Sequence, residues 1–400
     1  MTHSESTWPQ RREAGCPIDP PAVIARLREE HAGPARVRLY DGTTPWLVTR
    51  YRDVKAVLAD RAMSADPRTP GFPHPSEKTK VGRSKLRNFQ RMDPPEHDDH
   101  RRMLAPAFSL ANVEQKRPFV EETVELLLDD LEKSGPGADL VSLVAEPLPA
   151  RVTCQLLGLP LSDSEFFQYC VKTWTSETKS PEEGARASEE LLQYFADLVA
   201  DRNEHRGEDL VSQMIRDHVD PGRLSLDELE HMLFLLLVGG FDTTANMIAV
   251  GMLVLFQNPE QLVQLRRSPD LWPGAIEELL RYVTPAHEVG YRLALEDREV
   301  GGCPVSAGEG VIAPIMAANR DPNVFVDPDR LDIHRNARHH VAFGFGVHQC
   351  LGQPLARLEL SIVFRRLLER FPDLHLACEP HELEYTEALV VGVHSLPVAW

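Results

Sequence analysis

Apolar residues recur at helical spacing along most of the middle of the chain, and Gly, Pro or Ser separates the periodic segments. Few of these segments alternate between apolar and polar positions as a half-buried strand does. This succession predicts a mainly helical region. The predicted helices of this region are 113–133, 142–157, 162–178, 182–205 and 209–218, and two more, 22–31 and 51–59, are predicted nearer the N-terminus.

Short strand-like patterns lie on either side of this helical region. Two apolar runs within 37–49 flank the turn Asp41-Gly42, which predicts a β-hairpin. Segment 289–312 alternates with glycine turns and predicts short strands. The C-terminal segment 374–400 has the pattern of closing hairpins.

The fold class expected from this pattern is mainly α with small β-sheets. We expect a single domain over residues 1–400, with its β-rich part at about 30–60 and 289–312. Segment 65–90 is rich in Pro, Gly, Lys and Arg and has no period, so a long loop is predicted there. A loop of that length in a compact domain is usually functional or disordered.

The longest predicted helix begins at the capping box Ser225–Glu228 and continues to about Gln257. It has the length of a transmembrane span. Polar residues interrupt it between 242 and 246, however, and no cluster of Lys and Arg flanks it. We therefore interpret it as a helix buried through the centre of the protein.

The polar interruption of this helix follows two adjacent glycines, Gly239 and Gly240. Glycine and threonine are poor helix formers, so they weaken the helix at this point. Such a weak point suits the close approach of another group, or a hydroxyl that bonds back to the backbone. A simple bend in a core helix would have the same pattern.

Composition is that of an ordinary globular protein, with 42% hydrophobic and 26% charged residues. The net charge of -18 argues against nucleic acid and anionic membranes as partners. The N-terminal segment has no apolar core, so neither a signal peptide nor a membrane anchor is expected. The cysteines have no metal-like or disulfide spacing, which predicts reduced thiols and a cytoplasmic location. They lie at positions 16, 154, 170, 303, 350 and 378. The sequence does not determine the oligomeric state, so a monomer is the default expectation.

A glycine-rich stretch, Phe343–Gly352, delivers one cysteine to the start of a predicted helix at 353–368. Unpaired N–H groups and the helix dipole favour the thiolate of Cys350, which makes it a candidate ligand or nucleophile. As a nucleophile it would need His348 as its base, but nothing in the sequence orients that histidine. A zinc site would lack a second cysteine nearby, and a buried structural cysteine is the common role of a lone thiol.

The spacing Phe343-x-x-Gly346-x-His348-x-Cys350-x-Gly352 resembles the haem-ligand signature of the cytochromes P450, the haem-thiolate monooxygenases. The resemblance implies haem b (iron protoporphyrin IX) as cofactor, with Cys350 as the axial ligand of its iron. Gly346 would let the loop turn, and Gly352 would let the backbone approach the flat macrocycle. The other residues of the loop that would bind the cofactor are Phe343, Gly344 and His348.

Two further stretches resemble haem-binding segments of the same family. In Asp93-Pro-Pro-Glu-His97 the prolines start a helix, and His97 and Arg101 lie four residues apart on one face of it. The resemblance implies that both, together with Arg292, bind the haem propionates. Without it, the run would be a solvated polar face. The residues that would border the substrate pocket are 283–290, including His287 and Glu288, and 390–393.

The interrupted long helix resembles the oxygen-binding groove of the family, Gly-Gly-x-Asp/Glu-Thr. By this resemblance Gly239 and Gly240 make room for dioxygen on the haem. Asp242 and Thr243 would be the catalytic residues, because they would support the delivery of protons to it.

Glu278 and Arg281 lie three residues apart on one face of a predicted helix, among apolar neighbours. On a surface such a pair would contribute only about 0–1 kcal/mol. Buried, it would need a further partner for the guanidinium. The pair resembles the Glu-x-x-Arg of the family, with Arg330 as the third member of a structural triad that holds the cysteine segment.

These motifs occur in the family's order along nearly the whole chain, and the pattern resembles soluble actinobacterial members. The resemblance implies a prism-like fold with haem between the long central helix and the helix after the cysteine. It implies insertion of one oxygen atom from O2 into a hydrophobic small molecule, a natural product or xenobiotic. Electrons would come from NAD(P)H through a ferredoxin and its reductase, because the chain has no flavin or iron–sulfur motif.

An acidic ferredoxin would need a locally basic docking face. The candidate docking residues are Arg101, Arg102, Lys116, Arg338, His339, Arg357 and Arg365.

Alternatives to this interpretation are a haem-binding sensor or carrier, a peroxide-driven haem-thiolate enzyme, and a cysteine hydrolase without haem. The first two differ from the monooxygenase in needing no proton relay.

Overall fold

The computed structural model describes residues 6–10, 18–176, 178–286, 289–386 and 390–400, and of residues 83–85 the backbone only. The chain forms two compact units. The first comprises Met1–His100, Glu277–Leu331 and Asn336–Cys350. The second comprises Arg101–Ile276, Asp332–Arg335 and Leu351–Trp400.

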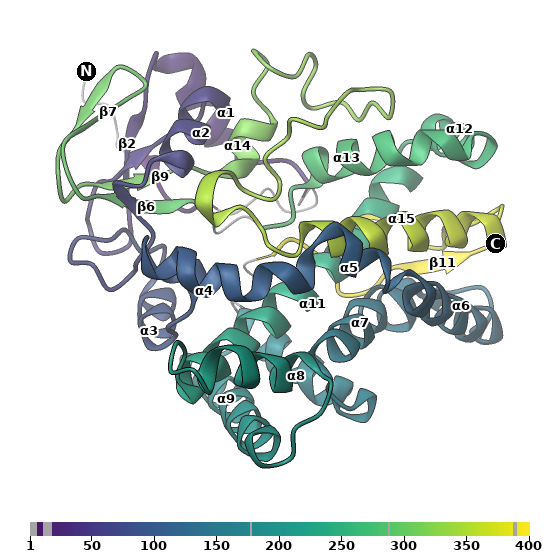
Figure 1. Ribbon diagram of the computed structural model, residues 1–400. Helices are drawn as coiled ribbons and strands as arrows, with labels where there is room; N and C mark the ends of the chain where they lie inside the picture. Colours follow the sequence, from purple (N-terminus) through teal and green to yellow (C-terminus); the bar gives the residue numbers. More distant parts are fainter. Residues whose placement is uncertain (1–5, 11–17, 177, 287–288, 387–389) are drawn as a thin grey trace. The chain divides into compact units, whose positions relative to one another are not determined.

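The first unit contains a mixed sheet (Figure 1). Its strands are β1 (Ser6–Thr7), β2 (Ala35–Arg38), β3 (Trp46–Leu47), β4 (Met63–Ser64), β6 (Tyr291–Ala294) and β9 (Gly310–Ile312). They lie in the order β1-β2-β3-β9-β6-β4. The pair β2–β3 is the hairpin predicted around Gly42, whose φ of 83° suits a glycine at the turn. A separate antiparallel pair joins β7 (Arg298–Val300) and β8 (Cys303–Val305).

Helices cover both faces of this sheet. Neighbouring residues of a strand point to opposite sides, so a strand of apolar residues presents an apolar surface on each face. The helices within the first unit are α1 (Ala22–Glu30), α2 (Tyr51–Ala59), α3 (Glu77–Lys85) and α14 (Ile315–Asn319), with the short turns η1 (Phe89–Arg91) and η7 (Gly346–His348). Ile312 shares a buried cluster with Ile24 of α1. The adjacent Val311 belongs to a cluster with Val57 of α2 and Val341. The segment before the cysteine is thus anchored in the core of this unit.

The predicted long loop over 65–90 is wrong in its second half, where α3 and η1 form. Ser76 caps α3: its hydroxyl accepts from the Thr79 N–H, and the Thr79 hydroxyl accepts from the Ser76 N–H. The helix has the sequence EKTKVGRSK, which contains a single apolar residue. Because it has no apolar stripe, hydrophobic periodicity could not reveal it.

The second unit is a set of helices around α11 (Leu226–Phe256), which contacts α7 (Pro147–Leu157), α8 (Ser164–Thr175), α9 (Pro181–Glu204) and α15 (Gln353–Arg370). The predicted capping box of α11 is confirmed, because Ser225 Oγ accepts from the Glu228 N–H at 3.1 Å. By length and composition α11 could cross a membrane, but 61% of its most apolar window is buried in the structure. Burial of that extent is typical of a core helix.

Further helices and a small sheet complete the second unit. The helices are α5 (Leu110–Glu114), α6 (Arg117–Ser134), α10 (Leu210–Met214) and α12 (Pro259–Arg267), with the short segments η2 (Ala105–Phe108), η3 (Val141–Ala145), η4 (Leu161–Asp163), η5 (Ile215–Val219), η6 (Pro269–Leu271) and η8 (Pro380–Glu382). The sheet has the order β10 (His375–Leu376), β11 (Pro397–Ala399), β5 (Ala138–Asp139). Two helices, α4 (Glu96–Leu104) and α13 (Trp272–Val283), have residues in both units.

Candidate active site

Backbone hydrogen bonds close the cysteine loop, by which we mean residues 340–350 of the first unit. The Gly344 N–H donates to the Val341 carbonyl at 2.8 Å, and the Cys350 N–H donates to the Phe343 carbonyl at 2.8 Å. Cys350 itself is exposed. Helix α15 begins three residues later, at Gln353, so the cysteine directly precedes a helix N-terminus.

Glycine is required at one turn of this loop for two reasons. Gly346 has a φ of 74°, and a Cβ there would lie 2.4 Å from the carbonyl oxygen of Leu58 in α2. Gly344 has nearly the same φ, 73°, but a Cβ there would approach no atom closer than 3.8 Å. The prediction that Gly346 lets the loop turn is confirmed. Gly352 has a φ of -77°, and its approach to a macrocycle stays a prediction.

Two of the predicted cofactor ligands meet in the first unit. The rings of His97 and His348 lie with their centroids 4.3 Å apart. His97 is fully buried, and its Nδ1 lies 2.8 Å from the Asp98 carboxylate. That hydrogen bond, and a second one from Arg61, hold the pKa of Asp98 below its ordinary value. The carboxylate in turn fixes the orientation of the imidazole.

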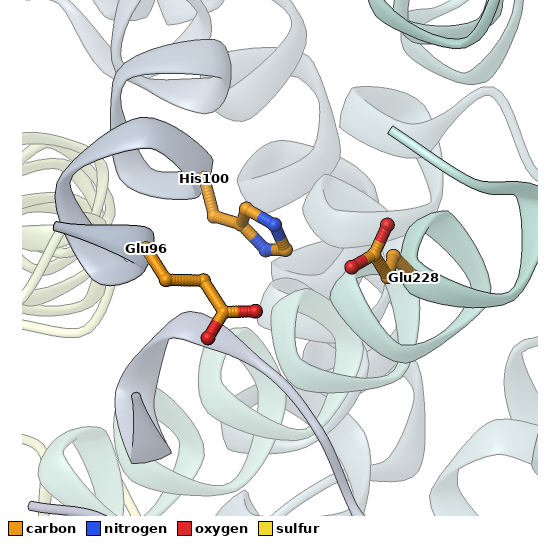
Figure 2. Close-up of side chains that lie close together, drawn as sticks. All are labelled: Glu96, His100 and Glu228. Carbon is orange, nitrogen blue, oxygen red and sulfur yellow. The ribbon is translucent and has the colours of Figure 1, made fainter. Parts of the chain in front are cut away.

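Helix α4 carries His97 and Arg101 one turn apart, as predicted. Glu96 and His100 are the neighbouring pair at the same spacing on this helix, and Figure 2 shows both side chains. Glu96 also forms an ion pair with Arg87. Figure 2 labels Glu228 as well, the capping residue of α11 described above.

Arg292 of β6 is a buried cation. Its Nη1 donates to the neighbouring Tyr291 carbonyl at 2.8 Å. Burial lowers the pKa of Arg292 to about 10, and the nearby Asp93 carboxylate offsets only part of this effect. Asp93 accepts hydrogen bonds from Ser64 Oγ and from the Ala65 N–H. A guanidinium with five donors in such surroundings suits an anionic partner, as a haem propionate would be.

The predicted structural pair is fully buried. Arg281 donates to both carboxylate oxygens of Glu278, through Nε at 2.7 Å and Nη2 at 2.8 Å. Its Nη1 donates to the carbonyls of Asn319 and Pro328, each at 2.8 Å. Arg330 was expected to add a guanidinium to this group. Its carbonyl oxygen lies 3.4 Å from Arg281 Nη2, and the residue is exposed. The expected contribution of its side chain stays a prediction.

The two glycines of α11, in the second unit, have different surroundings. Gly239 is exposed, and a Cβ there would meet nothing within 4 Å. A Cβ on Gly240 would lie 2.8 Å from Thr153 Oγ1 of α7, so this glycine permits close helix packing. Thr243 Oγ1 donates to the Gly239 carbonyl at 2.9 Å. The open position and the hydroxyl therefore lie on the same turn of α11.

Asp242 is a buried acid that is poised close to neutral pH. Burial and the neighbouring Glu146 carboxylate raise the pKa of Asp242 to about 6. Its Oδ1 accepts from Asn246 Nδ2 at 2.9 Å. Glu146 pairs with Lys172 of α8 at 2.6 Å, and about half of the Lys172 side chain is exposed. Charged groups thus lead from the buried acid toward the surface of the second unit.

A C-terminal hairpin packs against this polar part of α11. Tyr385 and Val393 form a β-bridge, and a Cβ on Gly392 would lie 1.6 Å from Asn246 Oδ1. The hairpin predicted near 390–393 is therefore present, while its role in lining a pocket stays a prediction. His287 and Glu288, also predicted to border the pocket, lie outside the described residues.

Each unit has residues that fit a haem. The first unit offers a thiol at a helix N-terminus, a buried imidazole and a buried guanidinium, which suit an iron ligand and propionate partners. The second unit offers an exposed glycine in a mostly buried helix, which suits the close approach of a flat group or a small molecule.

Comparison with known proteins agrees with this donor set. The family model "Cytochrome P450" matches residues 271–392. Cytochrome P450-SU2 of Streptomyces griseolus is 46% identical over 399 residues, which is 98% of this chain and 97% of the relative. The chain belongs to the cytochrome P450 family. This chain is also 42% identical to pentalenic acid synthase of Streptomyces avermitilis, over 98% of its own length and 97% of that relative.

Solved structures confirm the fold class of this P450. The crystal structure of the mycinamicin VIII methyl hydroxylase MycCI from Micromonospora griseorubida, bound to mycinamicin VIII, superposes with a TM-score of 0.92 at 36% identity. The match covers 99% of this chain and 100% of that one. The expected family and the expected mainly helical fold with small sheets are both confirmed. The protein is a P450 monooxygenase, which rejects the alternative of a cysteine hydrolase without haem.

Sequence reasoning missed several residues around the site. Asn246 was seen only as a polar interruption of α11, although its spacing of four from Asp242 could have indicated the contact. His340, Glu277 and Asn319 make contacts around the start of the cysteine loop, and no local pattern in the sequence predicts these contacts. Long-range contacts of this kind become visible only in the folded chain.

Proposed function

We propose that this P450 uses electrons from a ferredoxin to hydroxylate a hydrophobic small molecule, a natural product or xenobiotic. The names of its relatives support the substrate class, since they refer to pentalenic acid and mycinamicin VIII. The observation that carries the proposal is the buried Asp242, with its raised pKa, beside Thr243 on α11. Electron-driven monooxygenation needs protons at the reaction centre, and this pair is suited to supply them.

The residues that would hold the cofactor come from the loop, α4, α11 and β6. Cys350 would bind the haem iron, and bound haem supplies the activation of O2. Arg292, His97 and Arg101 would bind the propionates. The remaining contacts would come from Phe343, Gly344, His348, Gly352, Gly239, Gly240 and Thr243.

Asp242 would move protons because its pKa lies near the working pH. Its carboxyl can take up a proton from the side of Glu146 and Lys172 and release it toward the turn that carries the Thr243 hydroxyl. Asn246 keeps one carboxylate oxygen oriented through its 2.9 Å hydrogen bond. The Gly239 carbonyl holds the Thr243 hydroxyl in one orientation.

The ferredoxin would dock on basic residues that lie near the cysteine loop in the sequence. On α15, Arg365 forms an ion pair with Glu369 at 2.9 Å. The later Arg366 and Arg370 pair with acids of α6, including Glu125. Arg357 lies near the start of α15, seven residues after Cys350, and donates to Gln353 at 3.0 Å. We assign the contact on this helix to its N-terminal half, around Arg357, because this half follows the cysteine most closely. Lys116 and Arg102 are further basic candidates of the second unit, and Arg338 and His339 are exposed candidates of the first.

Reconstitution tests this function directly. The purified haem protein is mixed with a surrogate ferredoxin, its reductase and NADPH, and ethoxycoumarin serves as a general test substrate. We expect product whose new oxygen derives from O2, and little product from hydrogen peroxide alone. Reduction without product for any substrate in a broad panel would favour a sensor or carrier. Product with peroxide but not with electrons would favour the peroxide-driven enzyme.

A further inference from the structure

Asn319 occupies a junction of three hydrogen bonds in the first unit. It is fully buried at the C-terminus of α14. Its carbonyl accepts from Arg281 Nη1, and its side-chain Nδ2 donates to Thr284 Oγ1, both at 2.8 Å. Its Oδ1 accepts from the Val341 N–H, also at 2.8 Å. One side chain therefore joins the end of α13 to the start of the cysteine loop.

The donor and acceptor roles of its two partners fix the orientation of the Asn319 side-chain amide. The Thr284 hydroxyl donates to the Arg281 carbonyl at 2.8 Å, so its oxygen is left to accept from an N–H. The Val341 partner is an N–H and can only donate. The NH2 group of Asn319 must therefore face Thr284, and its oxygen must face Val341. Thr284 is itself held in a strained backbone conformation, with a φ of 43°, at 1% exposure.

A second side chain holds the next peptide of the loop. His340 Nδ1 accepts from the Ala342 N–H at 3.0 Å, and its Nε2 lies 3.0 Å from the Glu277 carboxylate. Because Nδ1 accepts, the proton of the neutral ring is on Nε2 and is donated to Glu277. Two successive N–H groups at the start of the loop, at 341 and 342, are thus bound by buried side chains.

From Val341 the contacts continue to the cysteine. The Val341 carbonyl accepts from Gly344 N–H, which closes the first turn of the loop. The adjacent Phe343 carbonyl accepts from Cys350 N–H. A shift of Val341 would therefore change the turn that presents the cysteine.

We propose that Asn319 is a positioning residue for the thiolate, which acts through Val341 to set the geometry of Cys350. His340 assists it by fixing Ala342. The inference rests on Cys350 as the haem ligand of this P450. It predicts that the two side-chain hydrogen bonds of Asn319 have separable effects: the bond to Val341 sets the ligand, and the bond to Thr284 contributes to stability only.

Two near-isosteric substitutions separate these bonds. Asn319→Leu removes both of them, whereas Thr284→Val removes the one to Thr284 and keeps the one to Val341. Three properties are measured in holoenzyme: the Soret band of the reduced carbon monoxide complex, the reduction potential of the haem, and the thermal midpoint. We expect Asn319→Leu to shift the potential and to increase several-fold the share of the blue-shifted carbon monoxide band. Thr284→Val should lower the thermal midpoint and leave spectrum and potential at wild-type values.

Equal spectra and potentials in wild type and Asn319→Leu would overturn the inference, as would identical changes in both variants. If Asn319→Leu does not fold, Asn319→Asp replaces it, since a carboxylate can still accept from Val341. A wild-type spectrum for Asn319→Asp supports the positioning role, and a displaced band contradicts it. Failure of the wild type itself to form the thiolate–carbon monoxide complex would refute the ligand assignment and would be distinguishable from all of these results.

Discussion

The cysteine loop and the polar stretch of α11 hold their reactive groups in opposite ways. In the loop, each described contact at its start is made by a buried side chain or a closed backbone turn, and Cys350 is the exposed end of that structure. In α11, Asp242 is buried, its pKa is close to neutral, and one carboxylate oxygen has no hydrogen-bond partner among the described residues.

The difference corresponds to the role that the proposed function gives to each region. A metal ligand is useful when its position is fixed, because geometry and surrounding hydrogen bonds tune the metal. A proton relay is useful when its acid can change charge at working pH, which needs a group that its surroundings do not lock in one state. If the proposed function is correct, rigidity in the first unit and an adjustable acid in the second would be complementary parts of one activity.

The largest effect is expected from Gly346→Ala in the rigid loop. The new Cβ would clash with the Leu58 carbonyl and would also force alanine to a left-handed φ. We expect a loss of stability of about 3 kcal/mol or more, and loss of thiolate-bound haem. Haem content and the thermal midpoint measure both. Gly344→Ala is the matched control, because its φ is nearly the same but its Cβ has room; equal effects would show that the contact with α2 is unimportant.

Asp242→Asn tests the adjustable region. An amide cannot donate and regain a proton as a carboxyl does, so product formation should fall by about 100-fold. Reduction of the haem by ferredoxin should remain at the wild-type rate. Thr243→Ala should instead uncouple the enzyme, so that less product forms per NADPH consumed. Unchanged product per NADPH in both variants would remove the proton relay from α11.

Glu359 of α15 is a second buried acid, which can be compared with Asp242. Among the described residues, no charged group lies beside it as Glu146 lies beside Asp242. Burial raises the pKa of Glu359 to about 8, from 4.5, and its Oε2 has no hydrogen-bond partner among the described residues. A carboxyl whose folded pKa is raised disfavours the folded state above pH 4.5, increasingly up to pH 8. Glu359→Gln should therefore stabilise the protein by about 2 kcal/mol at pH 7 and have little effect at pH 4.

Chemical denaturation of wild type and Glu359→Gln between pH 4 and pH 7 measures this difference in the free energy of unfolding. A stability gain that is the same at pH 4 and pH 7 would mean that ionisation of Glu359 is not the cause. Loss of turnover in this variant, with its stability raised, would mean that the acid has a role in the reaction.

The smallest effect is expected at the docking face. Arg357→Glu should slow haem reduction by ferredoxin several-fold at low salt, and the difference from wild type should shrink as salt is added. Arg365→Glu is the control, since Glu369 already balances that charge. Stopped-flow formation of the carbon monoxide complex reports the rate. A stronger effect at Arg365 than at Arg357 would place the contact on the other half of α15.

Much of this arrangement could be predicted from the sequence because its signals are local. The capping box at Ser225, the turn glycine Gly346 and the spacing of four between His97 and Arg101 all follow from neighbouring residues. Helix α3 was missed because it is almost entirely polar. The carbonyl contact of Arg330 with Arg281 could not be predicted, since spacing cannot tell whether a side chain or a carbonyl reaches that guanidinium. The contacts of Asn319 and His340 could not be predicted, because their partners lie up to 63 residues away in the sequence.

The most direct test of the central claim is the absorption spectrum of dithionite-reduced protein with carbon monoxide, for wild type and Cys350→Ser side by side. We expect the far-red-shifted Soret band of a thiolate-bound haem for wild type and its loss in Cys350→Ser. A wild-type band typical of histidine ligation, or a far-red-shifted band that survives in Cys350→Ser, would contradict the assignment of Cys350 as the haem ligand.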